Sequence, residues 1–520
     1  MTKSSLALTA AVCLQLLILF LPFAKDLVGA EKRPNILFIY ADDQNTRTLG
    51  CYENAWSGVR TPNIDALARR GIRFKHCYLG SWCMPSRATL LTGHYPHAIQ
   101  SMTMEGTYPG SKYDPQKCPF WPGEFRKHGY HTAQIGKWHT GTDTGFGRDW
   151  DYQIVWNRPK HPDNAGNYYK DQILEFNSVQ RQVEGYSTDN YSQWACDYIR
   201  GENRDTSKPW YLWLCYGAVH GPTTPAPRHV GKLAQEPVEI PTDIIGPRPT
   251  KPAYLNATQA WDKGADGVIY AGKSGERFGD DENQAKRRKY TDWVHQVNEC
   301  AMALDEGVGQ VLAALRDSGQ LENTLVVYSA DQGFAMGEHG FRAKLGPYEA
   351  NYCSPLIVSW AKHIPEGKVS RIPVSGPDLV QTFFATAGIS LPWKMHGRDL
   401  TEVLTNPDAA REDRVLLYEH MGQQYGSETD TIPTDDRIYH SNVPRWIAIR
   451  FGKYKYVRTL IAGEMEEIYD VDSDPKELTN LALDPHNQAL LADLRQRAVD
   501  ELRRTDAKFA DKMPATKLMQ

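Results

Sequence analysis

Two pairs of oxygen-bearing side chains follow short apolar runs that lie far apart in the sequence: Asp42 and Asp43, and Asp331 and Gln332. Carboxylate and amide oxygens are the ligands that Ca²⁺ and Mg²⁺ prefer, whereas structural zinc sites use Cys and His. The chain contains neither a Cys-x-x-Cys nor a His-Glu-x-x-His motif, so zinc has little support. An isolated acidic pair after a strand is more often a turn or a helix cap. A cation site therefore requires that the two pairs meet.

Cys83 begins the segment CMPSR, which continues through apolar residues to Gly93. Pro85 suits the first turn of a helix, because that position needs no amide donor. Cys83 would then lie at a helix N-terminus, where the backbone partial charge favours an ionised oxygen. Arg87 lies one turn further along and can face the same site, where its guanidinium could hold an anionic oxygen. An isolated Cys is more often a buried thiol or half of a disulfide.

Basic and imidazole side chains occur in three further segments: Lys137 and His139 in GKWH, His220 in AVHGP, and Lys344 in EHGFRAK. Lysine can neutralise an anionic group, and histidine near neutral pH can transfer a proton. Taken alone, each is more often a solvated lysine or a surface or core histidine. Their assignment to a site depends on the segments occurring together.

These segments together resemble the signature of the type I sulfatases, members of the alkaline phosphatase superfamily: CMPSR, GKWH, His-x-Pro, and Gly-Glu-His-Gly with a downstream Lys. The acidic pairs match the same family, and the resemblance spans nearly the whole chain after its N-terminus. It implies that a formylglycine-generating enzyme oxidises Cys83 to formylglycine, an aldehyde whose hydrate attacks sulfur. It also implies one divalent ion, Ca²⁺ in preference to Mg²⁺, held by Asp42, Asp43, Asp331, Gln332 and the modified Cys83. Gln332 departs from the Asn or His common there, so the placement of its longer side chain stays open.

The resemblance also gives roles to the basic residues. Lys137 contacts the sulfate and the hydrated aldehyde, and His139 accepts the proton whose loss reforms the aldehyde and releases sulfate. His220 donates a proton or a hydrogen bond to the leaving oxygen. Lys344 contacts both the sulfate and the leaving oxygen, although Arg342 is close enough in sequence to compete for this role.

Each of these segments except CMPSR follows, directly or closely, a short apolar run rich in strand-forming residues: 35–40, 132–135, 210–216 and 325–330. Near-continuous apolar runs are typical of strands buried on both faces of a mostly parallel sheet. Open α/β sheets bind ligands at the carboxyl ends of their strands, so the segments can meet at one edge. Helical patterns alternate with the runs, the longest at about 285–317, which predicts an α/β fold. The resemblance implies the same fold, an alkaline-phosphatase-like sheet flanked by helices.

The character of the chain changes after about residue 400. A small antiparallel sheet is predicted by three strand-like runs, at 446–450, 454–458 and 467–470. An amphipathic helix follows at about 486–504. We therefore expect an α/β catalytic domain over residues 31–400 and a C-terminal antiparallel subdomain with a covering helix over residues 401–520.

The N-terminus has a basic start, an apolar stretch over residues 6–24, and small residues before Glu31. This pattern predicts a secretory signal peptide at residues 1–30 and a secreted or periplasmic protein without stable membrane insertion after cleavage. An uncleaved membrane anchor is the alternative, since the apolar stretch is just long enough to span a bilayer. The nine cysteines are scattered and do not form a small-domain disulfide framework. The net charge of -4 argues against nucleic acid as a partner.

The function that follows is hydrolysis of sulfate esters. A sulfated carbohydrate is the expected substrate, because an exported enzyme with long polar insertions suits a bulky polar ligand. Those insertions are predicted at residues 157–185, 233–281 and 421–442, which are rich in Pro, Gly and polar residues. A phosphodiester or phosphonate monoester hydrolase of the same superfamily is one alternative. A catalytically silent glycan-binding homologue is another, although the full set of charged residues argues against it.

Overall fold

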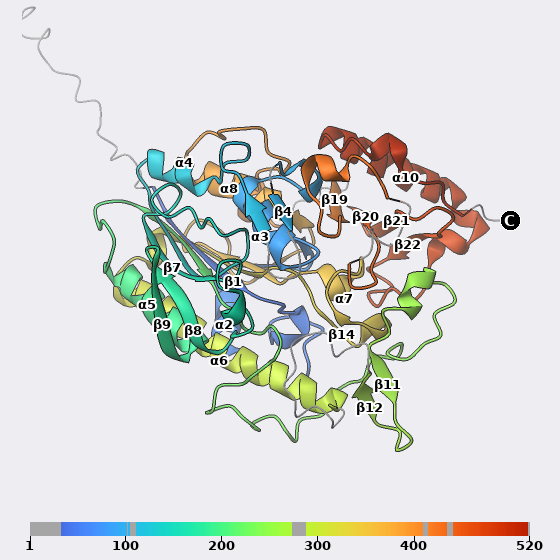
Figure 1. The fold of residues 1–520 in the computed structure, drawn as a ribbon, viewed down its shortest axis with the longest axis horizontal. Coiled ribbons are helices and arrows are strands. Elements are labelled where there is room, and N and C mark those ends of the chain that lie inside the picture. Colours follow the sequence, from blue (N-terminus) through green and yellow to red (C-terminus); the bar gives the residue numbers. More distant parts are fainter. Residues whose placement is uncertain are drawn as a thin grey trace, which may run out of the picture. The chain divides into compact units, whose positions relative to one another are not determined.

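A ten-stranded sheet is the centre of the computed structural model, which describes residues 33–100, 102–104, 111–272, 288–408, 414–433 and 440–517 (Figure 1). The predicted signal peptide lies outside the described residues. Among the described helices, none combines the length and the apolar character needed to cross a bilayer. The eight cysteines of the described part of the chain are all free thiols.

The strand order in this sheet is β17-β2-β16-β13-β1-β10-β6-β7-β8-β9. Its five central strands, β13, β1, β10, β6 and β7, run parallel to one another. Strand β16 pairs antiparallel with β13 on one side, and β8 pairs antiparallel with β7 and β9 on the other. The mostly parallel α/β sheet expected from the apolar runs is therefore confirmed. The strands are β1 (Asn35–Ala41), β2 (Ile72–Phe74), β6 (His131–Trp138), β7 (Tyr152–Asn157), β8 (Lys170–Phe176), β9 (Val179–Tyr186), β10 (Trp210–Cys215), β13 (Thr324–Ala330), β16 (Leu356–Ser359) and β17 (Lys368–Ser370).

Helices cover both faces of the sheet (Figure 1). Alternate residues of β1 enter different cores: Phe38 packs with residues of α3, α4 and α8, whereas Ile39 packs with residues of α2, α5 and α6. This explains why β1 is apolar at every position rather than at every second one. The helices are α2 (Pro62–Arg69), α3 (Cys83–Thr92), α4 (Pro122–Lys127), α5 (Ser187–Arg200), α6 (Tyr290–Asp317), α7 (Glu349–Tyr352), α8 (Gly376–Ala387), α9 (Thr401–Thr405) and α10 (Gln488–Arg504).

A four-stranded antiparallel sheet forms near the C-terminus, in the order β19-β20-β21-β22. Strands β20 and β21 form a hairpin within the expected antiparallel sheet, and Phe451 pairs with Tyr454 at its turn. Helix α10 packs on this sheet through Leu494 and Leu502, which are fully buried. The strands are β19 (Val415–His420), β20 (Trp446–Phe451), β21 (Tyr454–Thr459) and β22 (Glu466–Asp470).

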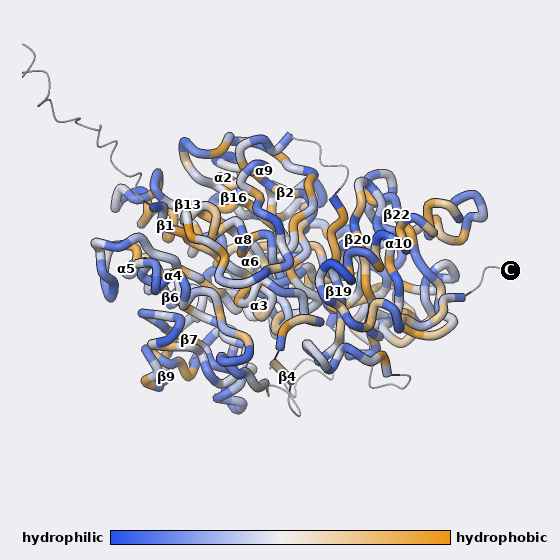
Figure 2. Tube along the Cα trace, turned by 90° about the horizontal axis from the view of Figure 1, so that it is seen from above, coloured by the Kyte–Doolittle hydropathy of each residue, from blue (hydrophilic) through white to orange (hydrophobic). Residues whose placement is uncertain are grey.

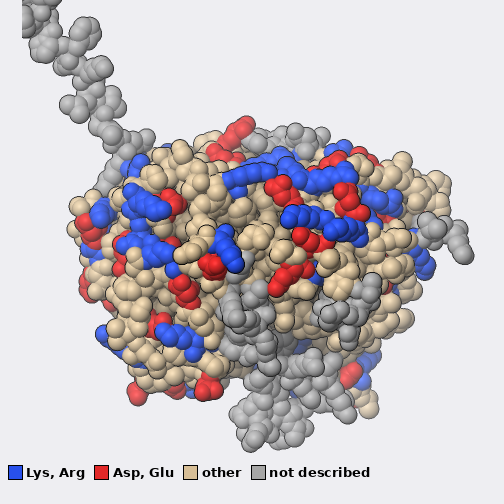
Figure 3. Space-filling model, turned by 45° about the horizontal axis from the view of Figure 1, so that its top comes forward, with Lys and Arg blue, Asp and Glu red and all other residues tan. Residues whose placement is uncertain are grey.

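Four two-stranded sheets complete the described strands: β3 (Cys77–Tyr78) with β18 (Val374–Ser375), β4 (Met102–Met104) with β5 (Ser111–Tyr113), β11 (Trp261–Lys263) with β12 (Ile269–Ala271), and β14 (Ala335–Met336) with β15 (Arg342–Ala343). Figure 2 shows hydrophobic stretches at β1, β13 and β20, in line with their burial. On the face seen in Figure 3, basic and acidic side chains are interspersed over much of the surface.

One expectation about the insertions needs correction. Residues 157–185 do not form a surface loop alone, because they contain β8 and most of β9, which extend the central sheet at one edge. Strand β9 is exposed or half-exposed along its whole length. Its polar composition therefore reflects an exposed edge strand rather than the absence of a strand.

Candidate active site

The two oxygen-bearing pairs meet at the carboxyl ends of neighbouring strands. Ala41 at the end of β1 pairs with Ala330 at the end of β13, so the residues that follow lie side by side. The Asp43 amide donates to Asp331 Oδ1 at 2.9 Å, and the Gln332 side-chain amide contacts the Asp43 carboxylate. The condition set by the sequence for a cation site is fulfilled.

The donor set of this cluster fits a hard divalent cation. Asp42, Asp43 and Asp331 are all buried, and Asp331 Oδ2 and Gln332 Oε1 have no hydrogen-bond partner among the described residues. Burial, together with the charges of Asp42 and Asp43, raises the pKa of Asp331 to about 8. A dication would offset this crowding and use the unsatisfied oxygens. Asp42, Asp43, Cys83 and His220 also offer potential ligand atoms that all lie within 4.8 Å of one another.

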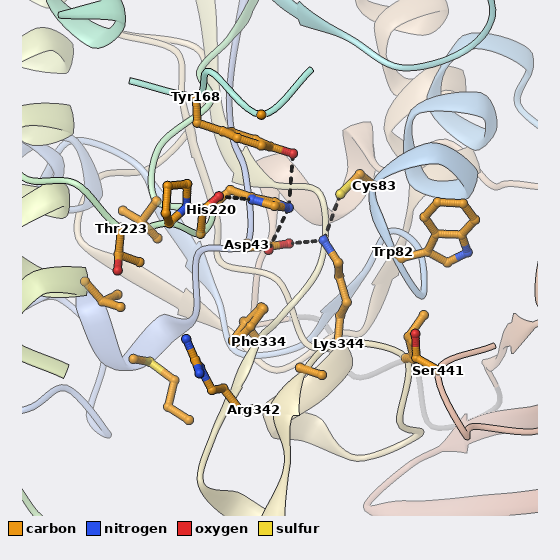
Figure 4. Close-up of a pocket in the computed structure, with 18 of the residues that line it drawn as sticks. Asp43, Trp82, Cys83, Tyr168, His220, Thr223, Phe334, Arg342, Lys344 and Ser441 are labelled. Carbon is orange, nitrogen blue, oxygen red and sulfur yellow. Dashed lines mark hydrogen bonds and ion pairs between the residues drawn. The ribbon is translucent and has the colours of Figure 1, made fainter. Parts of the chain in front are cut away.

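Cys83 is the first residue of α3 and lies beside this cluster. Its Sγ donates to Asp42 Oδ1 at 3.4 Å. The same Sγ accepts from Lys344 Nζ at 2.9 Å (Figure 4). Burial, with the nearby Asp42 carboxylate, raises the pKa of the thiol to about 12. The unmodified side chain is therefore a neutral thiol at physiological pH, and a thiol is a poor nucleophile. Helix α3 is anchored under the site by Ser86, whose Oγ donates to the Asp331 carbonyl at 2.5 Å.

Arg87 lies one turn along α3 and is buried beneath the carboxylates. Its Nη1 donates to the Lys137 carbonyl at 3.0 Å, and its Nη2 lies 3.8 Å from Asp42 Oδ2 and 3.6 Å from Asp331 Oδ2. The guanidinium also lies over the Tyr40 ring, 5.1 Å from its centroid. Arg87 is thus a fixed positive charge at the base of the site.

Lys137 and His139 enter the site from the end of β6. Gly136 makes this possible: its φ is 104°, and a Cβ there would lie 1.9 Å from the Cys215 carbonyl of β10. Lys137 is fully buried and forms an ion pair with Asp42. Although burial raises the pKa of the Asp42 carboxyl, the charges of Lys137, Arg87 and Lys344 hold it well below its usual range.

His139 is buried beside Arg158, which approaches its Nδ1 at 3.3 Å. Burial and the charges of Lys137 and Arg87 hold the pKa of His139 well below its usual range, so the ring is neutral. Because guanidinium can only donate, Nδ1 accepts in this arrangement and the ring proton is on Nε2.

His220 follows β10 and faces the same cluster. Its Nδ1 donates to the Gly221 carbonyl at 2.6 Å, while Nε2 lies 3.1 Å from Tyr168 Oη and 3.5 Å from Asp43 Oδ2. The Tyr168 and His220 rings are stacked, with centroids 3.9 Å apart. Burial and Lys344 hold the pKa of His220 well below its usual range, so Tyr168 donates its hydroxyl proton to Nε2 of a neutral ring.

Lys344 and Arg342 occupy different parts of the cavity (Figure 4). Lys344 Nζ donates to Asp43 Oδ1 at 2.6 Å as well as to Cys83 Sγ. Burial lowers the pKa of the Lys344 ammonium, but the neighbouring Asp43 and Cys83 outweigh burial and raise this pKa well above its usual value. The Arg342 guanidinium lies instead over the Trp293 ring, 5.3 Å from its centroid. The geometry thus brings Lys344, and not Arg342, to Cys83.

The cavity in front of Cys83 has a volume of about 450 Å³, within the usual range for a small-ligand site. Its lining includes five residues that the sequence motifs did not indicate: Trp82, Arg158, Tyr168, Arg288 and His440. Trp82 adjoins the CMPSR segment and could have been suspected from that position alone. The other four lie outside every motif, and three of them, Arg158, Tyr168 and His440, come from predicted insertions.

The family models and the relatives found by comparison with known proteins all indicate the same family. The family model described as "Sulfatase" matches residues 34–389, and one described as "N-sulphoglucosamine sulphohydrolase, C-terminal" matches residues 337–505. The chain is 29% identical to an N-acetylglucosamine-6-O-sulfatase of Bacteroides thetaiotaomicron, over 94% of this chain and 88% of that protein. It is 25% identical to an arylsulfatase of Clostridium perfringens, over 92% of this chain and 96% of that one.

Solved structures show the same similarity. A protein in complex with its substrate D-glucosamine-2-N,6-O-disulfate superposes with a TM-score of 0.77 and 25% identity, over 92% of this chain and all of that one. A phosphonate monoester hydrolase from Silicibacter pomeroyi has the same fold, with a TM-score of 0.67 and 21% identity, over 92% of this chain and 96% of that one. Since the "Sulfatase" model covers more than half of its residues, the chain belongs to the sulfatase family of the alkaline phosphatase superfamily and is a sulfuric ester hydrolase.

Proposed function

We propose that this enzyme removes sulfate from a sulfated saccharide, using a formylglycine made from Cys83 and one divalent cation, Ca²⁺ in preference to Mg²⁺. The observation that carries the proposal is the convergence of three buried carboxylates and three buried cations on Cys83. Such a site suits an oxyanion ester whose charge must be neutralised out of water.

The formylglycine hydrate supplies a nucleophilic oxygen, and the cation supplies a Lewis acid for that oxygen and for the ester. Asp42, Asp43, Asp331 and the Gln332 amide oxygen would hold the cation, and the N-terminus of α3 presents position 83 beside them. The unsatisfied Gln332 Oε1 supports this residue as a ligand despite its departure from the family pattern.

Three cations bind the sulfate oxygens. Arg87, Lys137 and Lys344 are buried and already lie against the carboxylates that would hold the metal. With the dication bound, the carboxylate charges are largely offset, and the three side chains leave net positive charge for the ester. This charge requires no rearrangement during the reaction, which makes it effective in lowering the barrier.

Proton transfer falls to the two buried imidazoles. His220 points its Nε2 towards the cavity, and it can donate a proton to the leaving oxygen once this nitrogen has been protonated; in the structure Nε2 accepts from Tyr168 Oη, 3.1 Å away, so that hydroxyl is the neighbouring proton source. His139 accepts the proton that must leave position 83 before sulfate is released. For this role the Arg158 contact to its Nδ1 has to give way, or the ring proton has to leave Nε2.

A saccharide substrate is supported by the relatives and by the cavity. The relative from Bacteroides thetaiotaomicron acts on N-acetylglucosamine 6-O-sulfate, and the superposable structure binds a disulfated glucosamine. The cavity offers aromatic surfaces from Trp82, Tyr168 and Trp293, on which a sugar ring can pack. Export to the periplasm or the medium, as the N-terminal sequence predicts, would bring the enzyme to such substrates.

The test is a desulfation screen with defined sulfated saccharides, including N-acetylglucosamine 6-O-sulfate. The enzyme is co-produced with a formylglycine-generating enzyme, and Cys83→Ala serves as the matched control. We expect sulfate release by the wild type and none by the variant. Peptide mass analysis should show loss of sulfur at position 83. Activity that persists in Cys83→Ala would refute the mechanism.

A sulfate and a phosphate ester of the same phenol test the phosphoester alternative. The likeness to a phosphonate monoester hydrolase concerns the fold only, so we expect the sulfate ester to be hydrolysed faster. An unmodified thiol at position 83, in protein made with the maturing enzyme present, would instead indicate a silent homologue.

A further inference from the structure

Two hydrogen bonds join the C-terminal sheet to the backbone beside the reacting groups. Trp446 Nε1 donates to the carbonyl of Leu345, which directly follows Lys344, at 2.8 Å. His420 Nδ1 lies 2.9 Å from Ser81 Oγ and shares a hydrogen bond with it, two residues before the nucleophile position. Neither Trp446 nor His420 is among the described residues that line the cavity. Any effect of either side chain on the reaction must therefore pass through the residue that it holds.

Trp446 and His420 form a cross-strand pair. His420 is the last residue of β19 and Trp446 is the first of β20, and they face each other at the end of a ladder of six residue pairs. Their ring centroids lie 6.1 Å apart, and both residues are fully buried. Cross-strand neighbours on one face of a sheet stabilise each other, so the ladder fixes the location of both hydrogen-bonding groups.

The two held segments are also bonded to each other. The Leu345 amide donates to the Ser81 carbonyl at 3.0 Å, and the Lys344 ammonium lies 2.9 Å from Cys83 Sγ. A lysine side chain is long and flexible, so its ammonium is placed accurately only if the backbone that carries it is fixed. The sheet and the two segments thus form one closed set of bonds around the groups that react.

Two further bonds connect the same segments to the C-terminal part of the chain. Trp82 Nε1 donates to the Gly422 carbonyl at 3.1 Å, two residues after the end of β19. Lys455 Nζ, from β21, donates to the Pro347 carbonyl at 2.9 Å, three residues after Lys344. Each segment is therefore held at two places, and the C-terminal sheet is more than a neighbour of the site.

We propose that Trp446 and His420 are positioning residues for the sulfatase reaction. Trp446 holds the Lys344 segment through the Leu345 carbonyl. His420 holds the nucleophile position through the Ser81 hydroxyl. The inference rests on the proposed function, because the groups that are held act only within that mechanism. A displacement of about 1 Å in a reacting group can cost about 10²-fold in rate, so these bonds contribute to catalysis as well as to stability.

Trp446→Phe tests the first half of the inference, because it removes the indole N–H and keeps an aromatic ring. With N-acetylglucosamine 6-O-sulfate we expect kcat to fall about tenfold, the value of one well-placed hydrogen bond. The loss should be smaller with 4-nitrophenyl sulfate, since its phenolate leaves with little help from Lys344. Trp210→Phe is the matched control, because its indole donates to Gln320 Oε1 at 2.9 Å at the start of β10, away from the carboxyl ends of the strands. The control should keep the wild-type kcat on both esters.

A double-mutant cycle with Lys344→Ala separates positioning from stability. If Trp446 acts through Lys344, Trp446→Phe should change kcat by less than about twofold in the Lys344→Ala enzyme. The same loss of kcat in both backgrounds would overturn this half of the inference. A lower Tm with a wild-type kcat would also overturn it, because the bond would then serve stability alone.

Ser81→Ala and His420→Leu, alone and together, test the second half. The nucleophile position serves both esters, so each change should lower kcat on both by the same factor, about threefold to tenfold. The double variant should lose no more than the single variants, because all three remove the same bond. Peptide mass analysis gives the loss of sulfur at position 83, and kcat is compared per formylglycine. Losses that multiply, or a wild-type kcat in Ser81→Ala, would overturn this half.

Ser81→Ala removes one oxygen atom and leaves the core intact, so the inference stays open to refutation even if Trp446→Phe does not fold. Absence of sulfate release by the wild type on both esters would refute the proposed function itself, which is a separate outcome.

Discussion

Replacing Lys344 by Ala tests the central electrostatic argument. Lys344 Nζ lies 2.9 Å from Cys83 Sγ and 2.6 Å from Asp43 Oδ1, so it can contact both the sulfate and the leaving oxygen. Removing one preorganised donor of this kind costs about 10²–10³-fold in kcat in other enzymes. We expect a loss of that size here, because the residue is buried and water replaces its charge poorly.

The leaving group makes the assay specific. If Lys344 stabilises the leaving oxygen, Lys344→Ala should lose more activity on a saccharide sulfate, whose alkoxide is basic, than on 4-nitrophenyl sulfate, whose phenolate leaves readily. Steady-state kcat on both esters gives this ratio. Lys362→Ala, at an exposed lysine paired with Glu322, is the matched control and should behave as wild type.

Two measurements exclude trivial explanations for a loss. Peptide mass analysis must show that position 83 of the variant has lost its sulfur to the same extent as in the wild type. Thermal unfolding with Ca²⁺ must show that the variant is folded, since Asp43 loses a buried partner. A kcat within threefold of wild type on the saccharide ester would refute the catalytic role given to Lys344. Equal losses of kcat on the two esters would refute its contact with the leaving oxygen.

Three further predictions concern the cation, pH and the C-terminal sheet. Chelation should abolish sulfate release and lower the Tm, because the negative charges of Asp42, Asp43 and Asp331 then repel one another without a cation between them. Added Ca²⁺ should restore both activity and Tm. A Tm unchanged by chelation would contradict the cation site. Burial, with His97 nearby, lowers the pKa of His94 to about 4, so its contribution to stability is complete above pH 6.5 and is lost as pH falls towards 4. Denaturant titrations should therefore show a decline in the free energy of unfolding over this window that is smaller by about 3 kcal/mol in His94→Asn. Lys455→Met should cost about 3–5 kcal/mol in urea unfolding, because it leaves Glu349 and Glu477 buried without their cation, whereas the exposed neighbour Lys453→Met should cost less than 1 kcal/mol.

The central strands could be predicted because they are buried on both faces. Runs such as residues 35–40 and 325–330 are apolar at nearly every position. A short run of this kind is typical of a strand in a parallel sheet that is covered by helices on both faces. The site residues could be placed because chemistry follows the carboxyl ends of parallel strands. Pairing of β1 with β13 brought Asp43 and Asp331 within hydrogen-bond distance, as that rule requires.

The part that sequence reasoning missed lies where position depends on long-range packing. Tyr168 comes from residues 157–185, whose polar composition resembles a loop, yet its ring stacks on His220 at 3.9 Å. The location of Tyr168 depends on β8 and β9 pairing at the sheet edge, and no local pattern encodes that pairing. His440 reaches the cavity from another predicted insertion for the same reason.

The choice between Arg342 and Lys344 shows how a break in local geometry decides a role. Two residues apart on a strand, they should point to the same face, and spacing alone cannot separate them. Strand β15 ends at Ala343, however, so Lys344 lies outside the strand, and the chain turns directly after it at Leu345, whose φ is 84°. The Leu345 amide then donates to the Ser81 carbonyl at 3.0 Å, which ties the turn to the segment that leads into α3. This bond fixes Lys344 beside Cys83 and leaves Arg342 on Trp293, so one short segment supplies a charge to each end of the cavity.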